Sequence, residues 1–98
     1  MPADNTVKSL HKAIAVLECF TPQEPELSIT EISARLGLHK STVHNIVSTF
    51  EQHGYIERNV QTNKCRLGIK ILELTHTFNV NHSLTNVIRP IIRDLANL

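Results

Sequence analysis

Hydrophobic residues recur at helical spacing over the first part of the chain. Between Val7 and Phe20 they fall at positions 7, 10, 14 and 17, with further apolar residues beside them. This spacing predicts a helix whose apolar surface is wide enough to face a core on one side and a partner on the other. The polar stretch 21–26 contains two prolines and is predicted to be a loop, and residues 27–29 form a short extended piece.

Two closely spaced helices are predicted next. Ser28 and Glu31 have the spacing of a capping box, so we expect a helix to begin one or two residues after Ser28. Gly37 suits the left-handed position that ends a helix, and a second helix, about 40–52, follows almost at once. Two short helices joined by a tight turn that contains glycine indicate a helix-turn-helix. The positions where these helices must touch are apolar or small: Ile32, Ser33, Leu36, Leu38, Val43 and Ile46.

A small β-hairpin is predicted after Gly54, which closes the second helix. Residues 55–58 alternate between apolar and polar side chains in the manner of a strand. Residues 59–64 are polar and rich in turn-forming residues, and residues 65–68 are expected to form the returning strand. Beside a helix-turn-helix, such a hairpin is expected to act as a wing.

The last third is predicted to be helical again. A leucine-rich helix is expected from 69 to 78, a break at 79–83, and an amphipathic segment at 84–98 in which Pro90 implies a kink or a helix start. The predicted fold class is therefore mainly α with a small β-hairpin, a winged helix-turn-helix followed by linker helices. This divides the chain into a disordered N-terminus (1–6), the winged helix-turn-helix domain (7–68) and linker or dimerisation helices (69–98).

The second helix of the motif has an unusual polar face. On a helical wheel, Val43, Val47 and Phe50 share one side, and the opposite side holds short hydrogen-bonding side chains where a solvated face normally has Glu and Lys. Asn can bond adenine, and Ser and Thr can bond bases or phosphates. A cation near the start of the helix favours phosphate. We therefore predict base contacts from the N-terminal half of the helix and phosphate contacts beside them: Ser41, Thr42, His44 and Asn45 for bases, Lys40 and Ser48 for phosphates.

The charge distribution agrees with a polyanionic partner. The net charge of the 98 residues is +1, but residues 35–70 hold six basic and two acidic side chains, a local charge of +4. In the wing, Arg58 and Lys64 are expected to contact flanking phosphates or to reach into a minor groove. Arg66 is a weaker candidate because strand alternation could turn it away, and Arg35 is a weaker phosphate candidate. Ordinary solvated charges are the alternative interpretation of all four.

Other chemistry has little support. The two cysteines, Cys19 and Cys65, are far apart and form no C-x-x-C pair, which argues against a zinc module and fits a reducing compartment. No histidine pair has the i, i+4 spacing of a helical metal site, and there is no glycine-rich phosphate loop. No signal sequence or membrane-spanning run is present. We expect a cytoplasmic protein that is not an enzyme and needs no metal or cofactor.

These features together resemble a known family. From residue 7 to 98 the chain is similar to the N-terminal winged helix-turn-helix of the IclR family of bacterial transcription regulators. The resemblance is carried by three stretches: VKSLHKAIAVLECF, LSITEISARLGLHKSTVHNIVSTFEQHGYIERN and CRLGIKILEL. Where the family usually has Pro, Arg and an aromatic residue, this chain has His39, Asn45 and Cys65, so no operator sequence is transferred from the family.

The resemblance implies an assembly as well as a fold. It implies a homodimer, often paired into a tetramer in the full-length protein, bound to a palindromic double-stranded DNA operator. It implies that a small-molecule effector binds a larger C-terminal domain, which this chain lacks. The dimer contact would use the first helix and the linker helix, through Leu10, Ile14, Leu17, Ile69, Leu72 and Phe78.

A rival interpretation keeps the same fold but gives it a different partner. A winged helix can serve as a protein–protein interaction module that does not bind DNA, because fold alone does not decide function. The face rich in Ser, Thr and Asn favours DNA, because a protein-docking face would expose more aromatic residues or leucines.

Overall fold

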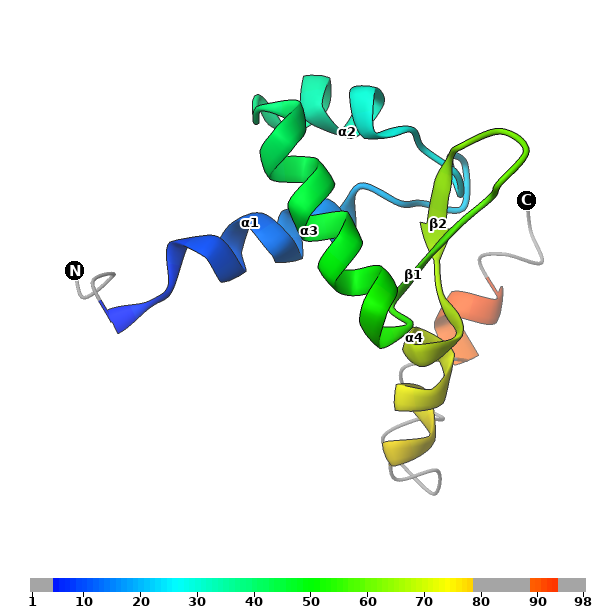
Figure 1. Ribbon diagram of the computed structural model, residues 1–98. Coiled ribbons are helices and arrows are strands. Elements are labelled where there is room, and N and C mark those ends of the chain that lie inside the picture. Colours follow the sequence, from blue (N-terminus) through cyan, green and yellow to red (C-terminus); the bar gives the residue numbers. More distant parts are fainter. Residues whose placement is uncertain (1–4, 79–88, 94–98) are drawn as a thin grey trace.

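The chain folds as a small helical domain with a hairpin on one side (Figure 1). The structure is a computed structural model and describes residues 5–78 and 89–93. Its helices and strands are, in order, α1 (Lys8–Glu18), α2 (Ile29–Leu36), α3 (Lys40–His53), β1 (Ile56–Arg58), β2 (Cys65–Leu67), α4 (Ile69–Leu74) and the 3-10 helix η2 (Thr75–Thr77). The predicted class, mainly α with a small β-hairpin in a winged helix-turn-helix, is confirmed.

The hydrophobic core lies where α1, α2, α3 and the hairpin meet. Every one of these elements contributes at least one buried side chain, and the loop between α1 and α2 contributes two more, Phe20 and Leu27. The buried core residues are Val16, Phe20, Leu27, Ile32, Val43, Val47, Ile56 and Cys65. Because the core is this thin, the position of α3 depends on its packing against α1, α2 and β1 together.

The turn between α2 and α3 fixes the helix-turn-helix. The predicted capping box is present at the start of α2, where the Ser28 hydroxyl accepts from the Glu31 amide and Glu31 Oε1 accepts from the Ser28 amide at 2.8 Å. At the other end, Gly37 adopts φ 66°, a left-handed conformation that side chains disfavour. The Ser33 hydroxyl then donates to the carbonyl of Leu38 across the turn. The small residue at 33 therefore does more than allow close approach, since it also ties the turn to α2.

The hairpin is antiparallel and is extended by a third short segment. Arg58 pairs with Cys65 across the two strands, and Leu27 forms an isolated bridge on the other side of Cys65, with hydrogen bonds of 2.9 and 2.8 Å. At the base of the hairpin, a Cβ added to Gly68 would lie 2.3 Å from the carbonyl oxygen of Gly54. The end of α3 and the start of α4 therefore touch through backbone, which sets the angle at which the hairpin leaves the helices.

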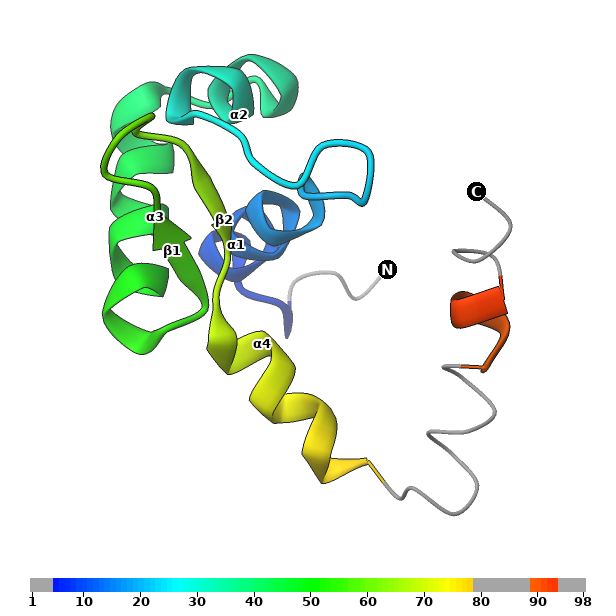
Figure 2. The same ribbon diagram turned by 90° about the vertical axis from the view of Figure 1, so that its right-hand side faces the viewer.

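The helix after the wing is shorter than predicted. The α-helical part ends at Leu74 and η2 follows, so the predicted helix 69–78 is a short α-helix with a 3-10 extension. Thr75 and Thr77 donate their hydroxyls to carbonyls three residues earlier, at 2.6 and 2.8 Å, and such bonds compete with the regular helical ladder. Figures 1 and 2 both show α4 leading away from the helical domain.

The ends of the chain are described only in part. Residues 89–93, which include Pro90, are helical. The predicted break at 79–83 and the rest of the segment 84–98 lie outside the described residues, as do residues 1–4 of the predicted disordered N-terminus. Within the described part, no helix is both long and apolar enough to cross a membrane.

Candidate nucleic-acid interface

The polar face of α3 is open to solvent. Ser41, His44 and Asn45 are exposed, and Thr42 and Ser48 are half-buried at its edges. Among the described residues, none of these five side chains is engaged in an intramolecular hydrogen bond. Their donors and acceptors are therefore available to a partner, and α3 presents them in rows along one helix face, as base recognition requires.

The start of α3 adds a site for negative charge. Unlike Ser28 in α2, the N-cap residue His39 makes no side-chain capping bond, and no acidic residue lies in the first turn. The first amide groups of α3 are therefore directed outward without a side-chain acceptor, beside the exposed Lys40. A phosphate oxygen suits this position, because both the amides and the helix dipole favour an anion there.

Ion pairs engage four of the six basic side chains in the stretch 35–70. Arg35 pairs with Glu24, Arg58 with Glu51 at 3.1 Å, Lys70 with Glu73 at 3.0 Å, and Arg66 with both Glu57 and Glu26 at 3.3 and 3.7 Å. Two of these carboxylates, at positions 24 and 26, come from the loop before α2, outside the stretch whose charge was counted from the sequence. The local charge of +4 therefore overstates what the folded surface offers. The sequence could not show the contacts of Glu24 and Glu26, because these carboxylates lie 11 and 40 residues before the arginines with which they pair.

Arg58 lies differently from the position that the sequence suggested. Ile56 and Arg58 share the inner face of β1, and the Arg58 side chain is only 22% exposed, whereas that of Arg66 is 52% exposed. The Nε atom of Arg58 is buried without a hydrogen-bond partner, beside the buried Cys65. Burial raises the pKa of the Cys65 thiol, and the charge of Arg58 opposes that shift. Strand alternation therefore turns Arg58 inward and Arg66 outward. From the sequence the reverse is expected, with Arg58 facing the DNA and Arg66 turned away.

The wing ends in a well-braced turn. The Asn59 side-chain oxygen accepts from the amides of Gln61 and Thr62 at 2.9 and 3.3 Å, and Asn63 adopts φ 61°. Lys64 follows, half-buried and without an ion-pair partner among the described residues. Glu31 lies close enough to feel its charge: the pKa of Glu31 is lowered mainly by the hydrogen bond from the Ser28 backbone and further by the charge of Lys64. Lys64 is thus the cation of the wing that remains available for phosphate.

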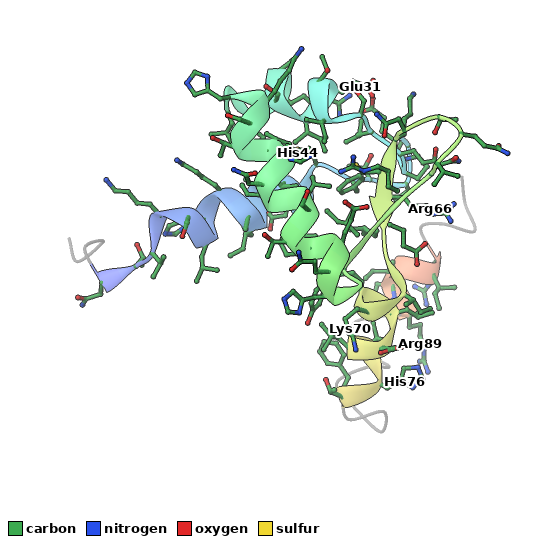
Figure 3. The ribbon with its side chains drawn as sticks, in the orientation of Figure 1. Glu31, His44, Arg66, Lys70, His76 and Arg89 are labelled. Atoms are coloured by element: carbon green, nitrogen blue, oxygen red, sulfur yellow. The ribbon has the colours of Figure 1, made fainter. Side chains whose placement is uncertain are left out.

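Figure 3 shows how the elements of the site are placed. His44 comes from α3, Arg66 from the hairpin and Glu31 from the start of α2, close to the tip of the hairpin. Helix α3 and the wing therefore contribute side chains to one surface from separate elements. The ion pair between Arg58 of β1 and Glu51 of α3 connects the two.

Apolar side chains remain exposed on α1 and α4. Leu10 and Ile14 are 59% and 50% exposed, and Leu17 is half-buried against the core. With Ile46 and Phe50 they line a groove between α1 and α3 of about 500 Å³, whose rim includes Asn45. The remaining predicted dimer residues are also about half exposed: Ile69 at 53%, Leu72 at 59% and Phe78 at 49%. A domain of this size gains stability by covering so much apolar surface.

The fold and this surface define a class of protein. A helix-turn-helix with an unengaged polar row on its second helix, flanked by a hairpin wing, is the DNA-binding domain of a transcription regulator. The IclR helix-turn-helix domain model matches residues 9–60, more than half of the chain. The chain therefore belongs to the IclR family, as the sequence resemblance predicted.

Individual members of the family are similar to this chain in sequence and in structure. The HTH-type transcriptional regulator XynR of Escherichia coli K12 is 43% identical over 70 residues, which are 71% of this chain and 28% of that protein. The Transcriptional repressor IclR of the same bacterium is 26% identical over 96% of this chain and 34% of its own length. A crystal structure of an IclR family transcriptional regulator from Brucella abortus superposes with a TM-score of 0.76 at 32% identity, over 97% of this chain and 36% of that one. The chain thus spans about a third of the length of these relatives.

Proposed function

We propose that α3 enters the major groove of an operator and that its N-terminal half reads the bases. Ser41, Thr42, His44 and Asn45 supply the base contacts, and Lys40 and Ser48 supply phosphate contacts beside them. The observation that carries this assignment is the row of side chains on α3 that have no hydrogen-bond partner in the part of the chain that the structure describes. Asn at position 45 gives the surface a preference for adenine at one base pair.

The wing holds the flanking backbone in this proposal. Lys64 contacts phosphate directly, because it has no ion-pair partner among the described residues. Arg58 and Arg35, which the sequence suggested as phosphate contacts, act mainly as positioning residues, since each is paired with a carboxylate of another element. Arg58 fixes the wing against α3, and Arg35 fixes the loop that precedes α2.

The functional unit in this proposal is a homodimer on a palindromic operator. The exposed apolar stripe of α1 and the exposed residues of α4 supply the contact between the two copies, which buries surface that would otherwise face water. The relatives extend well beyond the matched region, and a further domain of the full-length protein would bind a small-molecule effector and permit a tetramer. Catalysis has no part in this function.

The rival, a winged helix that docks only to protein, is weaker. Its docking surface would be expected to expose aromatic or leucine side chains on α3, whereas the exposed face of α3 carries hydroxyl, amide and imidazole groups. Among the described residues, no large exposed apolar side chain lies on α3, and a second copy would cover those on α1 and α4.

Fluorescence anisotropy tests the proposal. Labelled duplexes from promoter regions near the gene and from unrelated DNA are titrated at two salt concentrations. Tight promoter binding that falls steeply with salt, together with weaker binding to unrelated DNA, is the expected result. A chain that is dimeric in solution but binds neither pool would refute the DNA-binding proposal and support the rival.

A further inference from the structure

Four lysines among residues 5–78 have no carboxylate within ion-pair distance: Lys8, Lys12, Lys40 and Lys64. Lys40 lies at the start of the recognition helix and Lys64 in the wing, so both already have a place in the proposed DNA contact. The other two are exposed on the first turns of α1, a helix to which only dimerisation has been assigned.

Lys8 and Lys12 share one face of α1. They are four residues apart, so their side chains lie one above the other, and the same stripe continues through position 15 to Cys19. The surroundings of Cys19 show which side of the domain this stripe faces. Its pKa is raised by burial, and the charge of Arg35, in the last turn of α2, acts against that shift. The lysine face of α1 is therefore turned toward the side of the domain where α2 ends and α3 begins.

This face is not the one that the apolar contacts use. At about 100° per residue, Leu10 lies roughly 180° and Ile14 roughly 140° around the helix from the midpoint of the two lysines. The groove that α1 forms with α3 is lined from the side of Leu10, Ile14 and Leu17. A second copy of the chain seated on the apolar stripe would therefore leave Lys8 and Lys12 exposed.

The two lysines have no compensating charge within the helix. No acidic residue lies in the first turn of α1, and Glu18, in the last turn, is its one acidic residue. Two like charges at this spacing repel each other, so the arrangement carries a cost that no contact among the described residues offsets. A polyanion beside this face would offset that cost.

The placement of α1 shows which polyanion fits. In Figure 1 the first turns of α1 project from one side of α3, and the β1–β2 hairpin lies on the other side. If α3 occupies a major groove, the DNA backbone continues past α3 in both directions, toward the wing and toward the lysines. We propose that Lys8 and Lys12 form a second phosphate-binding surface, which contacts the operator backbone on the side of α3 opposite the wing. This inference rests on the proposed function.

The test measures the salt dependence of operator binding for single-charge variants. Lys8→Gln and Lys12→Gln should each reduce the slope of log Kd against log salt concentration by about one unit for each half-site, and the double variant by about two for each half-site. Lys70→Gln is the matched control, because Lys70 is paired with Glu73 on α4 and should leave the slope unchanged. Lys8→Arg and Lys12→Arg keep the charge and should keep the slope.

Neutral methylphosphonate linkages then locate the contact on the DNA. One duplex carries them on the wing side of the half-site and another on the opposite side. The double variant Lys8→Gln/Lys12→Gln should lose affinity normally on the first duplex and show no further loss on the second. An unchanged salt slope, or an equal further loss on both duplexes, would overturn the inference while operator binding itself stands. A wild-type chain that does not discriminate operator from unrelated DNA would instead overturn the proposed function, and this inference with it.

Discussion

Replacing Asn45 by alanine is the sharpest test of the recognition surface. The Asn45 side chain is exposed and makes no hydrogen bond within the described structure, so its removal leaves no buried polar group unsatisfied. The free energy of unfolding should therefore change by less than about 0.5 kcal/mol. A bidentate contact from Asn to adenine discriminates against a wrong base by about 1–3 kcal/mol, so Kd for each half-site should rise about 5- to 150-fold.

The assay is a competition titration against operator duplexes in which each base pair is changed in turn. Asn45→Ala should abolish the preference at one base pair and leave the preferences at the others intact. Gln52→Ala is the matched control, because Gln52 is exposed on the same face but lies seven residues further along α3, roughly 10 Å from Asn45 along the axis. Its amide should be beyond the reach of the bases. An Asn45→Ala variant with wild-type affinity and preference, or a Gln52→Ala variant with an equal loss, would refute the assignment of base reading to the N-terminal half of α3.

Three further outcomes are expected. Lys64→Ala should weaken binding to all duplexes alike and reduce the salt slope by about one unit for each half-site, and a loss confined to one sequence would make the wing a base reader instead. Gly68→Ala should lower the free energy of unfolding, measured in urea, by about 1–3 kcal/mol, because the new Cβ would lie 2.3 Å from the carbonyl oxygen of Gly54. An unchanged urea midpoint would show that the backbone between α3 and α4 shifts at little cost. The pKa of Glu31 is lowered from 4.5, first by its bond from the Ser28 backbone, so its contribution to stability is complete above that value and is lost as the pH falls through the folded-state pKa. Glu31→Gln, which keeps an acceptor for the capping box, should therefore flatten the fall in thermal midpoint below pH 4.5, and identical pH profiles for the two proteins would contradict this account.

The sequence determined the local structure because local structure depends on residues close together in the chain. The capping box of Ser28 and Glu31, the left-handed turn at Gly37 and the apolar side of α3 could all be recognised at spacings of three or four residues. The same spacing showed that the opposite side of α3 is polar and short-chained, and hence that it suits DNA. These features also carried the family resemblance that the comparisons confirm.

Only the tertiary structure decided which charges the surface retains. Glu24 and Glu26 reach Arg35 and Arg66 because the loop before α2 folds back beside the helix-turn-helix and the hairpin, and no spacing in the sequence predicts that contact. The inward position of Arg58 depends on which face of β1 packs against the core, and a strand of three residues is too short to reveal its inner face by alternation. Long-range contacts of this kind arise when the chain closes its core. They leave Lys40 and Lys64 as the available cations beside α3, and they leave Lys8 and Lys12, which the charge pattern along the chain did not single out, exposed without a carboxylate partner among the described residues.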